Sequence, residues 1–227
     1  HGGRHGGAML GITRPLTLVG LDGAILDGGS KNEIVLVSAS DVTLRGFTLR
    51  DSGRSSTREL AGIRVENSAR VRITGCRFVN CDYGIYLAKA RDCEIRDNVI
   101  EGTPDKELNS GNGIHLWSCD GVSVTDNRVT GHRDGIYLEF ASASSVERNV
   151  VTGNMRYGLH FMSTNNSRYR ENRFSGNGAG VAVMFSRQVE MTDNVFEFSW
   201  GSSAYGLLIK DLIDSRIRGN HFRHNST

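Results

Sequence analysis

Three residues that could bind a soft metal ion lie close together in the second half of the sequence, namely His160, Met162 and Met184. Thioether sulfur and imidazole nitrogen are ligands that suit Cu(I) rather than Mg²⁺ or Ca²⁺. On one β-strand His160 and Met162 would be ~6.6 Å apart, and Met184 on the next strand would lie ~4.8 Å from Met162. The spacing therefore predicts a Cu(I) site, to which Met155 could add a fourth ligand.

A second interpretation of these residues stays open. They could form an apolar patch that docks another protein, with His160 acting only as a hydrogen-bonding residue. His115 would lie two strands from His160, at ~9.6 Å, which is too far to share one metal ion. The choice between the two interpretations depends on the elements that carry the side chains.

Those elements follow from an internal repeat. A glycine followed by an aliphatic residue recurs at Gly62, Gly84, Gly113, Gly135, Gly158, Gly180 and Gly206. Fourteen residues after each glycine stand Cys76, Asn98, Asn127, Asn149, Asn172, Asn194 and Asn220. A fixed offset in every unit is the sequence signature of a solenoid, and the Asn position predicts a ladder of stacked side-chain amides at one corner.

Each unit contains three short segments in which apolar residues alternate with other residues, and no amphipathic helix separates them. Three strands in ~22 residues predict one coil of an all-β, single-stranded, right-handed parallel β-helix. One earlier coil is expected from the pairs Ile34/Leu36 and Val42/Leu44, and Leu16/Leu18 would end another. The prediction is one β-helix domain over residues 1–227 with about eight coils and an Asn ladder.

Alternation along the first strand of each coil defines two outward rows. The first row holds Arg64, Tyr86, His115, Tyr137, His160, Ala182 and Leu208, and the second holds Glu66, Ala88, Trp117, Glu139, Met162, Met184 and Lys210. A solvated face would be rich in Thr, Ser, Lys and Glu, so the aromatic, His and Met side chains predict a contact surface. The expected partner-binding residues are Tyr86, His115, Trp117, Tyr137 and Glu139.

Extra residues at 54–61, 102–112 and 200–205 all precede the first strand of the next coil. Insertions on a solenoid usually decorate its binding side, which favours the same face.

Several classes of function are disfavoured. Between Gly84 and Tyr205 the two outward rows contain a single carboxylate, Glu139, whereas glycosidases and lyases need clustered acids. The 27 Lys and Arg residues nearly balance the 25 Asp and Glu residues, so nucleic acid is not an expected partner. No apolar stretch approaches the ~20 residues that span a bilayer. The four cysteines form no CxxC motif and fall at different offsets in their coils, so we expect buried thiols.

Three segments carry a resemblance to a known family. The runs NMRYGLHFMS (154–163), NGAGVAVMFS (177–186) and WGSSAYGLLIK (200–210) resemble the NosD family, and GNGIHLW (111–117) and RDGIYLEF (133–140) are also similar to it. Generic β-helix repeats share inward aliphatic residues and Asn but have no reason to share outward His and Met. The resemblance covers nearly the whole chain.

The resemblance implies a periplasmic, non-catalytic factor in the maturation of nitrous-oxide reductase. NosD-like proteins are thought to act with the ATPase and membrane subunits of an ABC-type complex, with a copper-donor lipoprotein and with the reductase, whose copper–sulfide centre receives the metal. Family members continue through further coils, so the chain is expected to be a fragment that lacks C-terminal coils.

Two alternatives to copper delivery remain. One is a carbohydrate-active or polysaccharide-binding β-helix, because the fold alone allows it and Trp117, Tyr86 and Tyr137 could stack on sugars. The other is a purely structural docking scaffold. A copper titration distinguishes copper delivery from both alternatives. An oligosaccharide binding screen detects the carbohydrate-active or polysaccharide-binding protein.

Overall fold

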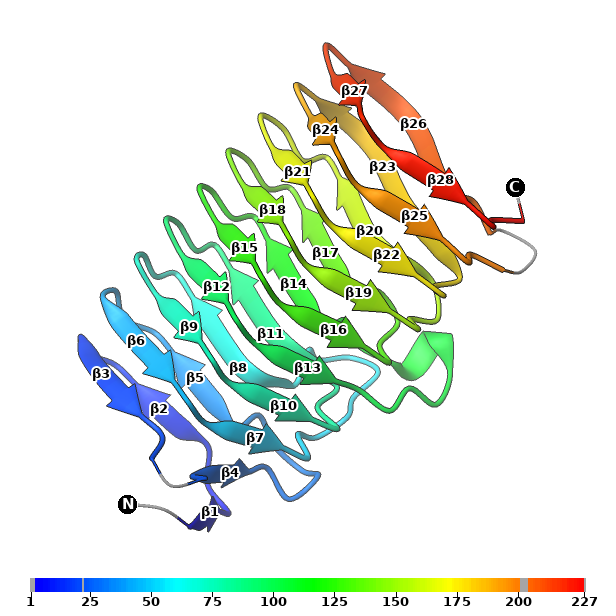
Figure 1. Cartoon of the computed structure of the whole chain (residues 1–227). Coiled ribbons are helices and arrows are strands. Elements are labelled where there is room, and N and C mark those ends of the chain that lie inside the picture. The colour runs from blue at the N-terminus through cyan, green and yellow to red at the C-terminus, as the bar shows by residue number, and fades with distance from the viewer. Residues whose placement is uncertain (1–2, 22, 201–203, 227) are drawn as a thin grey trace.

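The computed structural model describes residues 3–21, 23–200 and 204–226. Nearly all of its regular structure is β-strand, arranged in three parallel sheets that the chain visits in turn (Figure 1). Each coil contributes one strand to each sheet, so the elements stack along one axis from β1 to β28 (Figure 1). The all-β solenoid predicted from the repeat is confirmed.

The first sheet carries the outward rows described above. Its nine strands, in spatial order, are β2 (Leu10–Ile12), β5 (Val35–Val37), β8 (Ala61–Glu66), β11 (Tyr83–Ala88), β14 (Ile114–Trp117), β17 (Ile136–Glu139), β20 (Tyr157–Met162), β23 (Ala179–Arg187) and β26 (Leu207–Ile213). Each strand pairs in parallel with the equivalent strand of the next coil.

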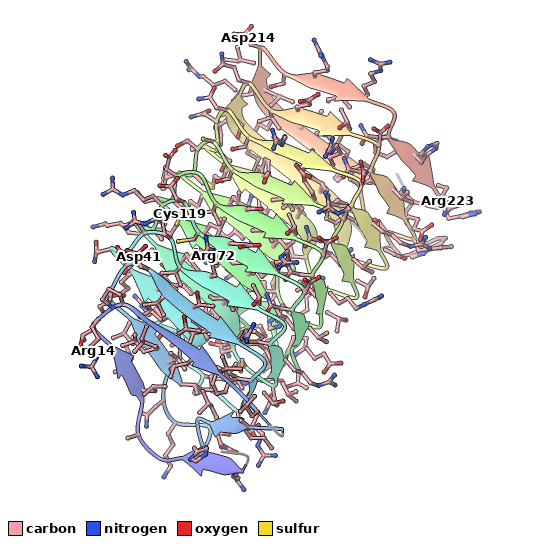
Figure 2. All side chains as sticks on the ribbon, turned by 60° about the vertical axis from the view of Figure 1, so that its left-hand side comes forward. Arg14, Asp41, Arg72, Cys119, Asp214 and Arg223 are labelled. Carbon is pink, nitrogen blue, oxygen red and sulfur yellow. The ribbon has the colours of Figure 1, made fainter. Side chains whose placement is uncertain are left out.

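The second sheet follows across a short corner. Its strands are β3 (Leu16–Val19), β6 (Val42–Arg45), β9 (Arg72–Thr74), β12 (Glu94–Arg96), β15 (Ser123–Thr125), β18 (Ser145–Glu147), β21 (Arg168–Arg170), β24 (Glu190–Thr192) and β27 (Arg216–Arg218). Figure 2 labels residues along the corner between these two sheets, from Arg14 near the N-terminal end to Asp214 near the C-terminal end.

The third sheet completes each coil. Its strands are β1 (Arg4–Gly6), β4 (Ile25–Asp27), β7 (Thr48–Arg50), β10 (Arg77–Val79), β13 (Val99–Glu101), β16 (Arg128–Thr130), β19 (Val150–Thr152), β22 (Arg173–Ser175), β25 (Val195–Glu197) and β28 (His221–Arg223). A 3-10 turn, η1 (Glu107–Asn109), lies in the 102–112 insertion.

The core is a continuous column of inward side chains from all three sheets. The aliphatic residues that follow each glycine stack in register, as in the pairs Ile85 with Ile114 and Leu87 with Leu116. These four side chains are buried, as are the equivalent residues of the neighbouring coils. Because each layer is buried by the coils above and below it, no coil is stable alone and the repeat is required.

The predicted Asn ladder joins the second and third sheets. The Asn149 side-chain oxygen accepts hydrogen bonds from the backbone N–H and the side-chain amide of Asn127, at 2.9 and 3.0 Å. The same two bonds connect Asn149 with Asn172. The residue before the Asn adopts the left-handed backbone that turns this corner, for example Asp126 and Arg148. The Asn backbone is thereby free to continue into the next strand.

Two details of the N-terminal coils differ from the sequence prediction. The expected fraction of a coil is a complete coil formed by β2, β3 and β4, so the described residues form nine coils, preceded by β1. In β5 the inward residues are Val35 and Val37, which pair with Ile63 and Val65, whereas Leu36 points outward beside Arg64. Four consecutive apolar residues at 34–37 give no alternation, and the choice of face there depends on pairing with β8.

Candidate functional site

The register of the first sheet places the two outward rows as the repeat predicted. Tyr137 pairs with His115 on one side and with His160 on the other. In the second row Met162 pairs with Met184. Strands β20 and β23 therefore bring His160, Met162 and Met184 onto adjacent outward positions of neighbouring coils.

The first outward row is a buried stack of rings rather than an exposed face. The Tyr137 ring stacks on His160 with ring centroids 4.4 Å apart and on His115 at 4.6 Å. Tyr86 meets His115 edge to face at 5.0 Å, and Tyr83 packs against both. Each ring covers its neighbours, so Tyr86, His115 and Tyr137 are buried, and their role in a partner-binding surface stays a prediction.

His160 is held beside a buried carboxylate that comes from the previous coil. Its Nδ1 lies 3.5 Å from Oδ2 of Asp134, which is fully buried. The Arg156 guanidinium donates two hydrogen bonds to the same carboxylate, at 2.8 and 2.5 Å, and the Tyr157 backbone N–H adds a third at 3.3 Å. Burial alone would raise the pKa of Asp134, but the hydrogen bonds from Arg156 and the nearby His160 ring hold this pKa at about 2. The carboxylate is therefore an anion at neutral pH.

Neither ring nitrogen of His160 has a hydrogen-bond partner of normal geometry among the described residues. The Nδ1 atom has the nearby carboxylate, whereas the Nε2 atom is buried and has no hydrogen-bond partner in the described part of the chain. Such an atom costs about 1–3 kcal/mol when it is left unpaired. A metal ion is one way to satisfy an imidazole lone pair in this position.

His115 lies in the same row but has different neighbours. Its Nδ1 is 3.3 Å from the side-chain amide nitrogen of Asn112, and its Nε2 is 4.0 Å from a carboxylate oxygen of Glu139. Burial lowers the pKa of His115 to about 3, with a smaller contribution from the charge of Arg133. His115 is therefore neutral at physiological pH.

The methionine pair sits at the edge of the ring stack. Met162 and Met184 are both half-buried, and the Tyr137 hydroxyl lies 3.4 Å from the Met162 sulfur as a hydrogen-bond donor. The phenol therefore connects the ring stack with the methionine row. Met155 is exposed in the turn before β20, and no contact that joins it to His160, Met162 or Met184 is described. Its role as a ligand stays a prediction.

An apolar rim includes the two methionines. Its members are Trp117, Phe140, Met162, Met184 and Phe185, of which Phe140 and Phe185 are exposed and the other three are half-buried. Phe140 is 55% exposed and Phe185 is 45% exposed. Both have a left-handed backbone, with φ of 52° and 53°, a conformation that bulky residues rarely adopt. Lysines approach the two ends of the rim, with Lys89 over the Trp117 ring and Lys210 over the Phe185 ring.

Asp134 and Arg156 are the site residues that the alternation argument missed. Asp134 immediately precedes Gly135, in a row that also contains Asn112 and Tyr157. Alternation assigns only the residues after the glycine to the outward rows, so it predicts nothing for the row of residues that precede the glycines. The sequence carried a signal, because Asp134 is the one carboxylate among the residues that precede the seven glycines, namely Ala61, Tyr83, Asn112, Asp134, Tyr157, Ala179 and Tyr205.

The cysteines are buried and free, as expected. Burial raises the pKa of Cys81 and Cys119 to about 12.

No cluster of three or more His, Cys, Asp or Glu residues suited to a metal ion occurs in the described part of the chain. Among the same residues, no helix is long and apolar enough to cross a bilayer.

Solved structures confirm the fold. The A-module of the mannuronan C-5 epimerase AlgE6 from Azotobacter vinelandii superposes with a TM-score of 0.75 and 16% identity, over 97% of this chain and 76% of the module. PfbA, a surface adhesin of Streptococcus pneumoniae, gives a TM-score of 0.74 at 12% identity, covering 100% of this chain and 72% of the adhesin. At these identities the likeness shows the β-helix and nothing about activity.

Sequence comparison gives more specific relatives. A probable ABC transporter binding protein NosD from Pseudomonas aeruginosa is 35% identical over 135 residues, which are 59% of this chain and 31% of that protein. The NosD of Stutzerimonas stutzeri is 31% identical over 126 residues, 55% of this chain and 29% of that protein. The matched segment thus spans about a third of each relative.

Two family models match the chain. The model of the right-handed β-helix region matches residues 18–118. The model described as "Periplasmic copper-binding protein (NosD)" matches residues 96–227, more than half of the chain, including both methionines and both histidines of the outward rows. The chain belongs to the NosD family.

Proposed function

We propose that this β-helix is a non-catalytic, periplasmic copper-handling protein that binds Cu(I) transiently at His160, Met162 and Met184. The observation that carries the proposal is the register of β20 and β23. It brings the two thioethers onto paired positions of neighbouring strands, two residues from an imidazole whose Nε2 has no hydrogen-bond partner among the residues that the structure describes. Copper is the cargo in this proposal, and the three side chains supply soft ligands for its passage.

The apolar rim supports a role in transfer between proteins. A patch of aromatic and thioether side chains beside a ligand set can seat a copper-carrying partner over the site. Of the residues expected at a partner-binding surface, Trp117 and Glu139 are half-buried at this edge, whereas Tyr86, His115 and Tyr137 support it from below. We further propose that the partners are those of its relatives' system, namely ABC transporter subunits, a copper-donor lipoprotein and nitrous-oxide reductase.

Competition with a Cu(I) chelator tests the metal site. The variant Met162→Leu/Met184→Leu keeps volume and apolarity, so the fold should survive while Cu(I) affinity falls at least tenfold. Met9→Leu changes an exposed methionine of the first coil and is the matched control. A separate Met155→Leu variant shows whether a fourth ligand contributes. Equal affinity of wild type and the double variant would disprove the site and leave the docking patch as the interpretation.

One observation favours a second candidate, a carbohydrate-active enzyme. Asp134, Arg156, His160 and Tyr137 combine an acid, a cation, an imidazole and a phenol, which are groups that proton abstraction from a uronic acid would need. However, Asp134 already neutralises Arg156, and both Asp134 and His160 are buried. Incubation with alginate and pectin should therefore give no unsaturated or epimerised product. Turnover that His160→Gln abolishes would favour the enzyme instead.

A further inference from the structure

The two histidines of the first outward row meet opposite hydrogen-bonding groups at the same ring atom. The Nδ1 of His115 faces an amide N–H₂ of Asn112, which is a donor. The Nδ1 of His160 faces the carboxylate of Asp134, which is an acceptor. Because a neutral imidazole has one N–H and one lone pair, the neighbour of Nδ1 decides which tautomer forms.

The orientation of the Asn112 amide is fixed by its own oxygen. Oδ1 accepts hydrogen bonds from the Asp134 backbone N–H and from Nε of Arg133, both at 3.3 Å. These donors would face a second donor if the amide were reversed. The nitrogen therefore points to His115, so Nδ1 of His115 is the acceptor and its Nε2 carries the proton, toward Glu139.

The ionisation of Asp134 is fixed in the same way. Two bonds from Arg156 and one from the Tyr157 backbone hold a fully buried carboxylate. An anion at 3.5 Å attracts a proton on Nδ1 of His160, so the lone pair resides on Nε2. This is the arrangement found where a metal-binding histidine donates its other N–H to a carboxylate.

We infer that Asp134, clamped by Arg156, is a positioning residue that selects the Nδ1–H tautomer of His160 and presents the Nε2 lone pair to a soft metal ion, whereas Asn112 holds His115 in the opposite tautomer and unfit to bind. The selectivity part of this inference rests on the proposed copper function. The tautomer part does not, because it concerns the metal-free protein.

Residue type and spacing do not distinguish the two histidines. Both follow a glycine by two residues, both are buried in the ring stack, and both contact Tyr137. The group that faces Nδ1 differs in its hydrogen-bonding character, a donor at His115 and an acceptor at His160. The single exchange of Asp134 for Asn would give His160 the neighbour that His115 now has.

Long-range ¹H–¹⁵N correlation spectra of the metal-free protein in mildly alkaline buffer test the tautomers directly. We expect His160 to show a protonated Nδ1 and an unprotonated Nε2, and His115 to show the reverse. A protonated Nε2 on His160 in the wild type would overturn the inference whatever its affinity for copper. This measurement needs no variant and so does not depend on a mutant folding.

The variant Asp134→Asn then tests the consequence. It should move the His160 proton to Nε2 and lower Cu(I) affinity at least tenfold, while circular dichroism shows an intact β-helix. Asn112→Asp is the mirror control, which should move the His115 proton to Nδ1 and leave Cu(I) affinity within about twofold. If Asp134→Asn switches the tautomer but leaves Cu(I) affinity unchanged, the positioning of the ring stands and the proposed copper site fails. If Asp134→Asn leaves the proton of His160 on Nδ1, Asp134 is not the positioning residue.

Discussion

The hydroxyl of Tyr137 lies 3.4 Å from the sulfur of Met162 on the next coil and donates to it. Tyr137 is itself paired in register with His160, so one phenol contacts two of the three proposed copper ligands. The ring stack and the methionine row are thereby mechanically linked. This link has a measurable consequence for the flexibility of Met162.

Replacing Tyr137 by Phe keeps the stacked ring and removes only the hydroxyl. An unrestrained methionine regains rotamer freedom worth about 1 kcal/mol, so Cu(I) affinity should fall about fivefold with little change in the melting temperature. A chelator competition with the Tyr137→Phe and wild-type proteins measures the difference. An affinity that rises would mean that the hydroxyl competes with the metal ion for the sulfur.

The Asn ladder should make a large contribution to stability at its centre. Asn149→Ala leaves the buried backbone N–H of Asn127 and one of its two side-chain amide hydrogens without an acceptor, while the other still donates to the Ile95 carbonyl, which should cost about 2–5 kcal/mol. The control is Asn32→Ala, at an exposed asparagine, which should change stability by less than about 0.5 kcal/mol. Urea denaturation followed by circular dichroism compares the two. A small effect at Asn149 would show that water replaces the ladder bonds.

Phe140 should lower the stability of the native protein. Its positive φ is disfavoured for a bulky side chain, whereas asparagine tolerates it, as Asn67 does at the equivalent position with φ of 49°. Phe140→Asn should therefore stabilise the protein by about 0.5–1 kcal/mol. The reverse exchange, Asn67→Phe, should destabilise it by a similar amount. If Phe140→Asn is destabilising, the ring contributes to folding rather than to docking.

His132 should make the protein sensitive to acid. Burial lowers the pKa of His132 to about 4, although the Asp82 backbone partly opposes this, and its Nε2 has no partner among the described residues. In the unfolded chain the pKa is about 6.5, so the unfolded state binds the extra proton first as pH falls. The contribution of His132 is complete above about pH 6.5 and decreases toward pH 4, by about 2 kcal/mol at pH 5.

The variant His132→Leu isolates this effect. Its stability should fall less than that of the wild type between pH 7 and pH 5, by about 2 kcal/mol in urea denaturation. The difference between the two proteins is the relevant quantity, because burial raises the pKa of Glu33 to about 7 and gives an opposite trend in both. Identical pH profiles would show that His132 is hydrated in the native state.

Most of the fold follows from the repeat. The glycine-to-Asn offset predicts the coil, the ladder and the two outward rows, because a shift of one residue would expose every inward aliphatic side chain of a strand. Where the offset is lacking, prediction was poorer. At 34–37 the inward residues were assigned one position early, and the first coil was not recognised as complete.

The candidate site, like the fold, was predicted only in part from the sequence. The sequence by itself determined that His160, Met162 and Met184 share one face, since register and alternation follow from a repeat that each coil must satisfy. Only the tertiary structure decided that the rings bury one another and that Asp134, which lies 26 residues before His160, reaches its ring while Asn112 reaches His115. Stacking sets which residues are neighbours, but burial and hydrogen bonding depend on side chains from adjacent turns, and no periodicity constrains those side chains.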